Sequence, residues 1–355
     1  GDDESIDITL DTDQVNAIFH IVSGRHLQVF TANAEFFCPQ GDTSVLTPEN
    51  FNIRRQTTYG SNFVNAKAFD GGTIFVQKSG RTVRELLFTD TELAYSANSL
   101  SLLSTHLVQT PNDLAIFGGS NARPEQYALF VNTDGTIANF HSVRAEKLAG
   151  WTHWSQTGAS FKSVEAVGTR CFFTVLRGSS YFLEELGDET SSLDHSTTKT
   201  ISSSGLTFTG LTAYNNQTVK VRSGTYYLGE FTISGSGVLT LSAGMECTEV
   251  TVGYDYTVTA ETMPVEVVLS TGSLRGQPKR ISRVIMGLDS SLSSTLEGSQ
   301  IILRQVTDDF SIAPSTFTGL KEFYVLGYAR DRSITIKQTD PLPMRVTGLV
   351  MEYGY

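Results

Sequence analysis

Two adjacent carboxylates, Glu184 and Glu185, are the first candidates for catalytic chemistry in this sequence. Most glycoside hydrolases use a pair of Asp or Glu side chains that flank the bond to be cleaved. Here the pair lies in residues 181–186, an alternating segment typical of a β-strand, where neighbouring side chains point to opposite faces. The two carboxylates therefore cannot form a catalytic pair by themselves, and we expect one to be buried or bridged and the other solvated.

Residues of types that could bind a metal occur in residues 11–16 and among the histidines, and neither group has the spacing of a metal site. Asp11-Thr12-Asp13-Gln14-Val15-Asn16 begins like a calcium loop, but Val15 stands where a third oxygen ligand belongs and the turn glycine is missing. Among the histidines, only His20 and His26 could approach each other, across a hairpin, and strand packing or surface exposure explains them more simply than zinc. The histidines are His20, His26, His106, His141, His153 and His195. The sequence predicts no metal site and no cofactor.

Two further groups could bind ligands. Arg54-Arg55 could hold a phosphate or a carboxylate, although a conformational role beside the turn at Tyr59-Gly60 is the simpler interpretation. Trp151, His153 and Trp154 form an aromatic cluster that could stack on a sugar ring, and packing in a core or an interface explains them equally well.

The motifs of common enzyme classes are missing from the sequence. There is no G-x-S-x-G elbow, no H-E-x-x-H, no P-loop and no G-x-G-x-x-G, so the sequence predicts no catalytic residue and no enzyme. A depolymerase acting through Glu184 or Asp188 is the third of three alternatives. Asn216-Gln217-Thr218 has the form of a glycosylation sequon, which matters only in a eukaryotic secretory setting.

Composition limits the class of protein. The formal net charge is −11 with a pI of about 5.0, so a basic surface for nucleic-acid phosphates is not expected. An acidic channel wall would still let a duplex pass without sticking, although an acidic balance is also ordinary for soluble proteins and is the simpler interpretation. The three cysteines, Cys38, Cys171 and Cys247, are odd in number and widely spaced, so we expect packed thiols rather than disulfides. No apolar run reaches the roughly 18 residues of a membrane span.

Repeated antiparallel meanders are the strongest structural signal. In residues 66–88, alternating segments are separated by the glycine-bearing tips Asp70-Gly71-Gly72 and Lys78-Ser79-Gly80, which supply the positive φ that short hairpin loops need. Similar units occupy residues 18–38, 113–143 and 163–186. A spacing of about 40 to 55 residues between equivalent strands is the period of a β-propeller blade. Two stacked sheets of a sandwich remain an alternative.

Other segments fill the spaces between these units. A short helix is predicted near residues 98–107, where Asn98 can cap it and Leu100, Leu103 and Leu107 share a face. The Ser, Thr and Asp-rich residues 188–204 indicate an exposed linker. Short alternating segments separated by Gly turns then predict a small β-sandwich or barrel, and longer strands follow at residues 280–288, 301–305, 321–328, 333–337 and 345–353.

The predicted fold is therefore all-β. Residues 1–193 form the first part of a β-propeller-like domain of repeated antiparallel meanders, residues 194–262 an inserted small β-sandwich, and residues 263–355 the strands that resume the larger domain. Because the sequence begins Gly1-Asp2-Asp3 rather than with Met, we expect its natural N-terminus to lie upstream.

Several local patterns, in order, resemble the tail nozzle (tail tubular protein B) family of short-tailed phages. The resemblance extends from about residue 15 to the end, and each fragment alone is weak. The fragments are Thr47-Pro48-Glu49-Asn50-Phe51 with Gln56-Thr57-Thr58-Tyr59-Gly60, Arg81-Thr82-Val83-Arg84-Glu85, Ser104-Thr105-His106-Leu107, Gly150-Trp151, Val175-Leu176-Arg177-Gly178 with Tyr181-Phe182-Leu183-Glu184, Val252-Gly253-Tyr254-Asp255-Tyr256 and Pro341-Leu342-Pro343.

The resemblance implies a non-enzymatic structural protein of a phage tail, assembled in the bacterial host cytoplasm and located in the virion. It implies a homohexameric ring, contacts with tail adaptor and fibre proteins, and DNA only as passing cargo, without a membrane span. The alternative is a β-propeller or adhesin module that binds a host glycan through Trp151, Trp154 and nearby tyrosines.

Overall fold

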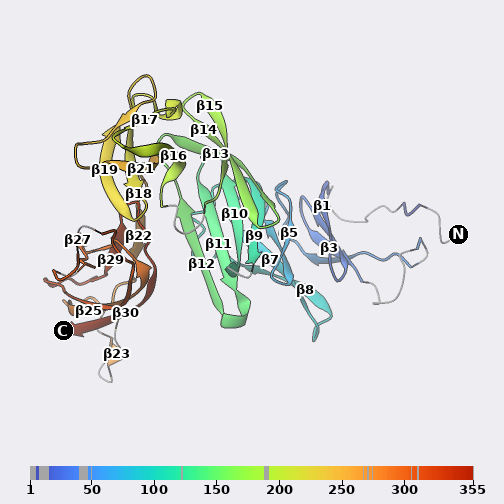
Figure 1. Ribbon diagram of the computed structural model, residues 1–355. Helices are drawn as coiled ribbons and strands as arrows, with labels where there is room; N and C mark the ends of the chain where they lie inside the picture. The colour runs from blue at the N-terminus through green and yellow to red at the C-terminus, as the bar shows by residue number, and fades with distance from the viewer. Residues whose placement is uncertain are drawn as a thin grey trace. The chain divides into compact units, whose positions relative to one another are not determined.

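The computed structural model describes residues 5–7, 16–39, 47–48, 50–120, 123–187, 192–266, 268–269, 272–273, 275–304, 306–309 and 312–354. Those residues form β-strands, turns and two short 3-10 helices, η1 (Arg144–Glu146) and η2 (Thr212–Tyr214). The chain divides into two compact units, Gly1–Leu186 and Gly187–Tyr355, and we describe each by itself (Figure 1). The predicted all-β class is confirmed.

Unit 1 consists of four consecutive antiparallel meanders, in which each strand pairs with its neighbours in the chain. The first meander has β1 (Ile18–Ser23), β2 (Leu27–Thr31), β3 (Glu35–Cys38) and β4 (Arg54–Thr57). The second has β5 (Lys67–Phe69), β6 (Gly72–Val76), β7 (Val83–Thr89) and β8 (Ala94–Ser99). The third has β9 (Pro111–Ser120), β10 (Arg123–Asn132), β11 (Ile137–Val143) and β12 (Leu148–Trp154), and the fourth has β13 (Ala159–Val167), β14 (Arg170–Arg177) and β15 (Ser180–Glu185).

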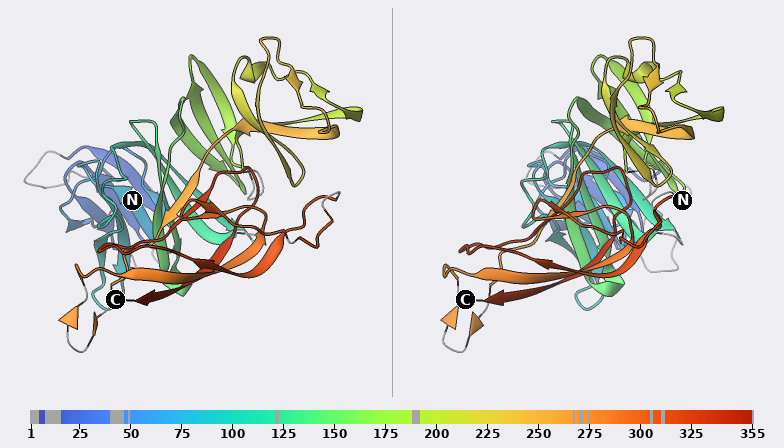
Figure 2. Two further views of the ribbon diagram at one scale, coloured as in Figure 1. Left: turned by 90° about the vertical axis from the view of Figure 1, so that its left-hand side faces the viewer. Right: turned by 60° about the vertical axis from the view of Figure 1, so that its left-hand side comes forward.

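The meanders stack face to face like the blades of a propeller (Figure 2). Ile74 and Phe75 are consecutive and fully buried, yet Phe75 packs against the first meander with Phe30, whereas Ile74 packs toward Phe130 of the third. In the same way, Phe130 and its neighbour Val131 enter different cores, because successive side chains of a strand alternate in direction. Burying one such side chain contributes about 1.5–3 kcal/mol, so apolar runs in central strands hold adjacent meanders together.

Unit 2 begins with a small β-domain. A sheet of β16 (Asp194–Gly205), β21 (Cys247–Tyr254), β18 (Thr218–Ser223) and β19 (Tyr226–Thr232) is joined by the short pair β17 (Thr207–Phe208) and β20 (Leu239–Thr240). Its core includes Phe208, Tyr214, Val221 and Val252, all 1% exposed or less. Buried Lys220 pairs with Asp255 at 2.7 Å and donates to the carbonyl of Thr339, which connects this domain to the segment that follows.

The rest of unit 2 forms two further sheets around one core. One sheet has the order β28 (Phe317–Tyr324), β25 (Arg280–Ser291), β30 (Val346–Gly354). The other has β22 (Val258–Glu261), β29 (Thr335–Gln338), β26 (Thr295–Leu296) and β27 (Ser299–Gln300), and β23 (Val268–Leu269) pairs with β24 (Gly272–Ser273). Ile281, Val284 and Ile336 lie in the shared core. That residues 263–355 resume the larger domain stays a prediction.

Three local predictions are wrong. In the helix predicted near residues 98–107, Asn98 and Ser99 instead end β8, where Asn98 pairs with Glu85 of β7, and residues 101–107 form a bend and turns that leave Leu103 91% exposed. The predicted linker, residues 188–204, overlaps the twelve-residue strand β16, which pairs with β21 far along the chain. Residues 301–304 lie outside any strand. Pairing with the adjacent strand β7 overrides the helical pattern, and pairing with the distant strand β21 overrides the linker-like composition.

The cysteines are free thiols, with Cys38 and Cys171 buried and Cys247 half-buried. Burial, with a smaller effect of the charge on Glu165, raises the pKa of Cys171 to about 12. A thiol with this pKa is almost entirely protonated at neutral pH, so Cys171 is a packing residue. Among the residues described above, no helix has the length and apolar character needed to cross a membrane.

Glu35 is a fully buried carboxylate that ties the first meander to the segment after β4. It accepts hydrogen bonds from the hydroxyls of Thr57, at 2.5 Å, and Ser61, at 2.9 Å. Burial raises the pKa of Glu35 above its ordinary value of 4.5. The two hydroxyl hydrogen bonds lower this pKa only in part, as do a hydrogen bond from the backbone of Tyr59 and the charge of Arg84.

Replacing Glu35 by Gln is expected to change how stability depends on pH. With a raised pKa in the folded state, Glu35 contributes fully to stability below pH 4.5, and this contribution is lost as the pH rises through the raised pKa. The free energy of unfolding of Glu35→Gln relative to the wild type should therefore increase between pH 4.5 and pH 7. Urea unfolding followed by tryptophan fluorescence measures it, since both tryptophans lie in unit 1. A difference independent of pH would contradict the assignment.

Candidate functional site

The two adjacent carboxylates of the sequence lie on opposite faces of β15 and are each bound by an arginine. Glu184 accepts two hydrogen bonds from Arg177, at 2.7 and 2.8 Å, and both side chains are largely buried. Glu185 is bound by Arg170 on the exposed face. Both pairs join β14 to β15, so they stabilise a hairpin. Asp188 lies outside the described residues.

The two tryptophans do not form one aromatic surface. Trp151 packs on Phe140, with ring centroids 5.0 Å apart, and its indole N–H donates to the carbonyl of Leu100. Trp154 packs instead toward Phe173 in the core on the other side of the third meander. The spacing of three residues in a strand places them on opposite faces. These contacts are those of packing residues.

The remaining candidates also have structural contacts. His20 contacts the carbonyl of Asn62 at 3.1 Å, and His26 contacts the hydroxyl of Tyr95 at the same distance. Arg54 and Arg55 are exposed on β4. Within the described part of the chain, no group of three or more His, Cys, Asp or Glu side chains could hold a metal ion. Residues 11–15 of the calcium-like segment lie outside it.

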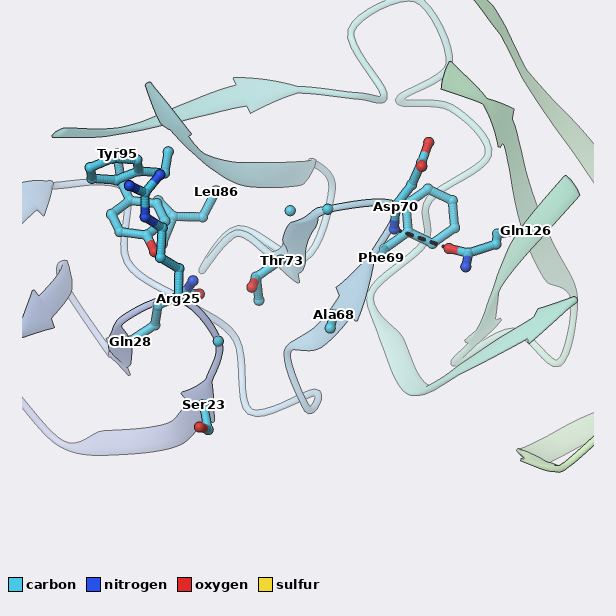
Figure 3. A pocket seen from close by; sticks show the side chains of 14 residues that line it. Ser23, Arg25, Gln28, Ala68, Phe69, Asp70, Thr73, Leu86, Tyr95 and Gln126 are labelled. Carbon is cyan, nitrogen blue, oxygen red and sulfur yellow. Dashed lines mark hydrogen bonds between the residues drawn. The ribbon is translucent and has the colours of Figure 1, made fainter. Parts of the chain in front are cut away.

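A cavity of about 450 Å³ lies in unit 1 where the hairpin tips of the first and second meanders meet. We call it the hairpin-tip cavity. Its lining combines hydroxyl, amide, carboxylate and guanidinium groups with aromatic rings (Figure 3). The lining residues are Ser23, Gly24, Arg25, Gln28, Ala68, Phe69, Asp70, Gly71, Gly72, Thr73, Leu86, Phe88, Tyr95 and Gln126.

Local backbone geometry positions the tip at residues 69–73. Asp70 has a φ of +44°, and its backbone N–H donates to the Gln126 side chain at 3.0 Å, which fixes the tip against β10. A Cβ on Gly72 would lie 2.7 Å from the carboxylate of Glu85, so glycine at this position leaves room for the Glu85 side chain. The Asp70 side chain is thereby held at one end of the cavity, as Figure 3 shows.

Opposite charges around the cavity are paired. Arg25 binds Asp90 at 2.6 Å and lies over the ring of Phe88, 4.7 Å from its centroid. Arg144, from η1, bridges Asp70 at 3.4 Å and the buried carboxylate of Glu85. The surroundings therefore favour an uncharged ligand over a strongly charged one.

The other end of the cavity is aromatic and buried. Tyr95, 6% exposed, contacts His26, and the His26 ring in turn packs against Phe37 and Phe88. Burial raises the pKa of Tyr95, against smaller opposite effects of Gln28, of Arg25 and of the His26 backbone. Tyr95 is therefore a neutral phenol near neutral pH.

The arrangement can bind a polar ligand of moderate size. Ligand cavities of 300–1,000 Å³ with a few converging polar groups and aromatic walls are the usual form of a small-molecule site. The two-carboxylate mechanism of glycoside hydrolysis needs carboxyl groups on both sides of the scissile bond. Among the described residues that line the cavity, one, Asp70, carries a carboxylate.

No protein-family model and no curated protein matches this chain. Among solved structures, it is similar to an exo-β-1,3-galactanase from Phanerochaete chrysosporium. A variant of that enzyme with β-1,3-galactotriose matches at 11% identity and a TM-score of 0.31, and the alignment covers 95% of this chain and 82% of that one. The same enzyme with galactose matches at 11% identity and a TM-score of 0.29, with the same coverage.

This finding corrects the functional prediction. The solved structures named above are those of a galactanase rather than of a tail protein, so a non-enzymatic structural role in a phage tail is not retained. At such identity and TM-scores, the similarity assigns no activity to this chain. Ring assembly, adaptor and fibre partners, passing DNA and a virion location stay predictions, since no observation tests them.

Sequence reasoning missed the hairpin-tip cavity. The sequence predicts the tip at Asp70-Gly71-Gly72 and places Ser23-Gly24 within the unit at residues 18–38, and turns that meet at one end of stacked sheets often carry binding residues. The sequence predicts the turns, but it does not predict the stacking of the sheets that brings these turns together.

Proposed function

We propose that the protein binds a glycan and holds one sugar residue in the hairpin-tip cavity. The observation that carries this proposal is the combination of polar groups and rings in one cavity: Arg25, Gln28 and Asp70 lie in it with Phe88 and Tyr95. Sugars present hydroxyl groups at their edges and C–H groups on their faces. Planar polar side chains suit the first, and aromatic rings suit the second.

A panel of immobilised neutral glycans tests the proposal. The wild-type protein should bind at least one of them, and Ser23→Trp should abolish that binding, because Ser23 is exposed at the β1–β2 tip and lines the cavity. Ser179→Trp is the matched control, because Ser179 is also exposed, at the β14–β15 tip, and does not line the cavity.

Two results would overturn the proposal. One is the absence of binding to every glycan of the panel. The other is binding that Ser23→Trp leaves unchanged, which would place the sugar elsewhere. Circular dichroism of both variants checks that each keeps the β-structure of the wild type.

A further inference from the structure

The last strand of the fourth meander, β15, has an open edge. Among the described strands it pairs with β14 alone, and this pairing has no bulge. Natural sheets protect such an edge with a lysine, a proline or a bulge. The residues of β15, Ser180 to Glu185, include neither Lys nor Pro. The opposite edge of the same sheet is protected, because β13 has an irregular register at exposed Lys162.

The register of the hairpin decides which residues of β15 face the open edge. The β14–β15 turn has two residues and is closed by the pair of Arg177 with Ser180. Opposite residues in an antiparallel pair alternate between hydrogen-bonded and non-hydrogen-bonded positions, and the pair that closes a two-residue turn is hydrogen-bonded. The backbone N–H and C=O groups of Tyr181, Leu183 and Glu185 therefore point away from β14 and toward the open edge.

The side chains of these three residues lie on one face of the sheet, opposite the face that enters the core with Val175. Tyr181 is 67% exposed and Leu183 is 77% exposed, so each keeps most of its surface in water. Glu185 lies beside them and is held by Arg170 of β14. An unpaired edge with exposed apolar side chains is a template for pairing with another strand.

The strand is complementary to itself about Leu183. When two copies of β15 run antiparallel with their Leu183 residues opposite each other, Tyr181 of each copy lies opposite Glu185 of the other. All of these positions are hydrogen-bonded pairs, each of which exchanges two N–H···O bonds between the copies. The phenol of Tyr181 then donates to a carboxylate that Arg170 already holds in place, and the two leucines pack together.

We infer that two copies of this chain pair edge to edge through β15 and form a two-fold symmetric dimer with one continuous sheet. A two-fold interface uses the same surface of both copies, which is what a self-complementary strand provides. Addition of a strand to an open edge is also a common mode of recognition. Because two six-residue strands form a small interface, the dissociation constant should be on the order of 10–100 µM.

Sedimentation velocity of the full chain at concentrations from about 5 to 300 µM, on both sides of this dissociation constant, tests the inference. The wild type should change from monomer to dimer over this range. Leu183→Pro removes an N–H that points away from β14, and Leu183→Lys places two charges opposite each other, so each should weaken the dimer roughly ten-fold or more. Val167→Lys is the matched control, since Val167 is 65% exposed but lies on β13, and it should dimerise like the wild type.

Disulfide trapping tests the register. Under mild oxidation, Leu183→Cys should form a covalent dimer, because opposite Cα atoms in a hydrogen-bonded pair are about 5.5 Å apart. Tyr181→Cys should not, because the two introduced thiols would be separated by four residues of strand, roughly 14 Å. The wild type, with its own three thiols, gives the background.

Three results would overturn the inference. One is a wild-type chain that stays monomeric over the whole concentration range. Another is a dimer that both Leu183→Pro and Leu183→Lys leave unchanged, which would place the contact elsewhere. The third is covalent dimer from Tyr181→Cys in the same yield as from Leu183→Cys.

Discussion

Replacing Arg177 by Met should lower the free energy of unfolding of unit 1 by about 3–5 kcal/mol, as expected when one partner of a buried ion pair is removed. Arg177 binds both oxygens of Glu184, and the side chains of the two residues are only 9% and 16% exposed. Without the guanidinium, the Glu184 carboxylate loses its bidentate partner in a site with little water. Whether this carboxylate then stays charged or takes up a proton, the folded state loses free energy of stabilisation.

The same hairpin provides the control. Arg170 binds both oxygens of Glu185 between the same two strands, but these side chains are 60% and 41% exposed. Arg170→Met should therefore have a much smaller effect, because water replaces the lost partner. The two arginines share strands and binding geometry, so the comparison isolates burial.

A double-mutant cycle separates the value of the pair from the cost of an unpaired charge. Arg177→Met with Glu184→Leu should recover most of the stability that Arg177→Met loses, because the double variant contains no unpaired carboxylate. Urea unfolding followed by tryptophan fluorescence is a suitable measurement, since Trp154 packs toward Phe173 of β14, the strand that contains Arg177. Equal losses for Arg177→Met and Arg170→Met would show that burial of the inner pair is not what matters.

Strands that have an alternating sequence pattern and are bounded by glycine-bearing turns could be predicted well. The unit predicted at residues 163–186 contains β14 as its middle strand, and Gly168 and Gly178, which both have positive φ, lie just beyond its two ends. At each tip a local property, the freedom of glycine to adopt positive φ, decides where the strand stops. No distant contact is needed for that decision.

Strands that depend on a distant partner could not be predicted. Residues 194–205 are polar and look like a linker, yet β21 pairs with them more than forty residues later. The same holds for the candidate site, since the side chains of Arg25, Asp70 and Gln126 come from three meanders and share a cavity only after the sheets stack.

Replacing Gly60 by Ala should lower the free energy of unfolding of unit 1 by about 3 kcal/mol or more, through strain and a backbone clash together. Gly60 has a φ of +71°, and a Cβ there would lie 2.4 Å from the carbonyl oxygen of Ala32 and 3.0 Å from the Cα of Asn33. Both obstacles are backbone atoms, so no side-chain rotation relieves the contact. The chain passes this point between the first and second meanders, where the N–H of Lys78 donates to the Gly60 carbonyl.

Gly168→Ala distinguishes the clash from the strain. Gly168 has a similar φ of +61°, but a Cβ there would meet nothing within 4 Å, so this variant carries only the conformational cost of about 1 kcal/mol. The difference between the two variants then measures the contact with the β2–β3 turn. Moving Gly60 away from that turn would also disturb Ser61, whose hydroxyl binds Glu35, so Gly60→Ala should shift the pH dependence of stability as well. If the two variants were equally stable, the first and second meanders would not be held together by this close approach.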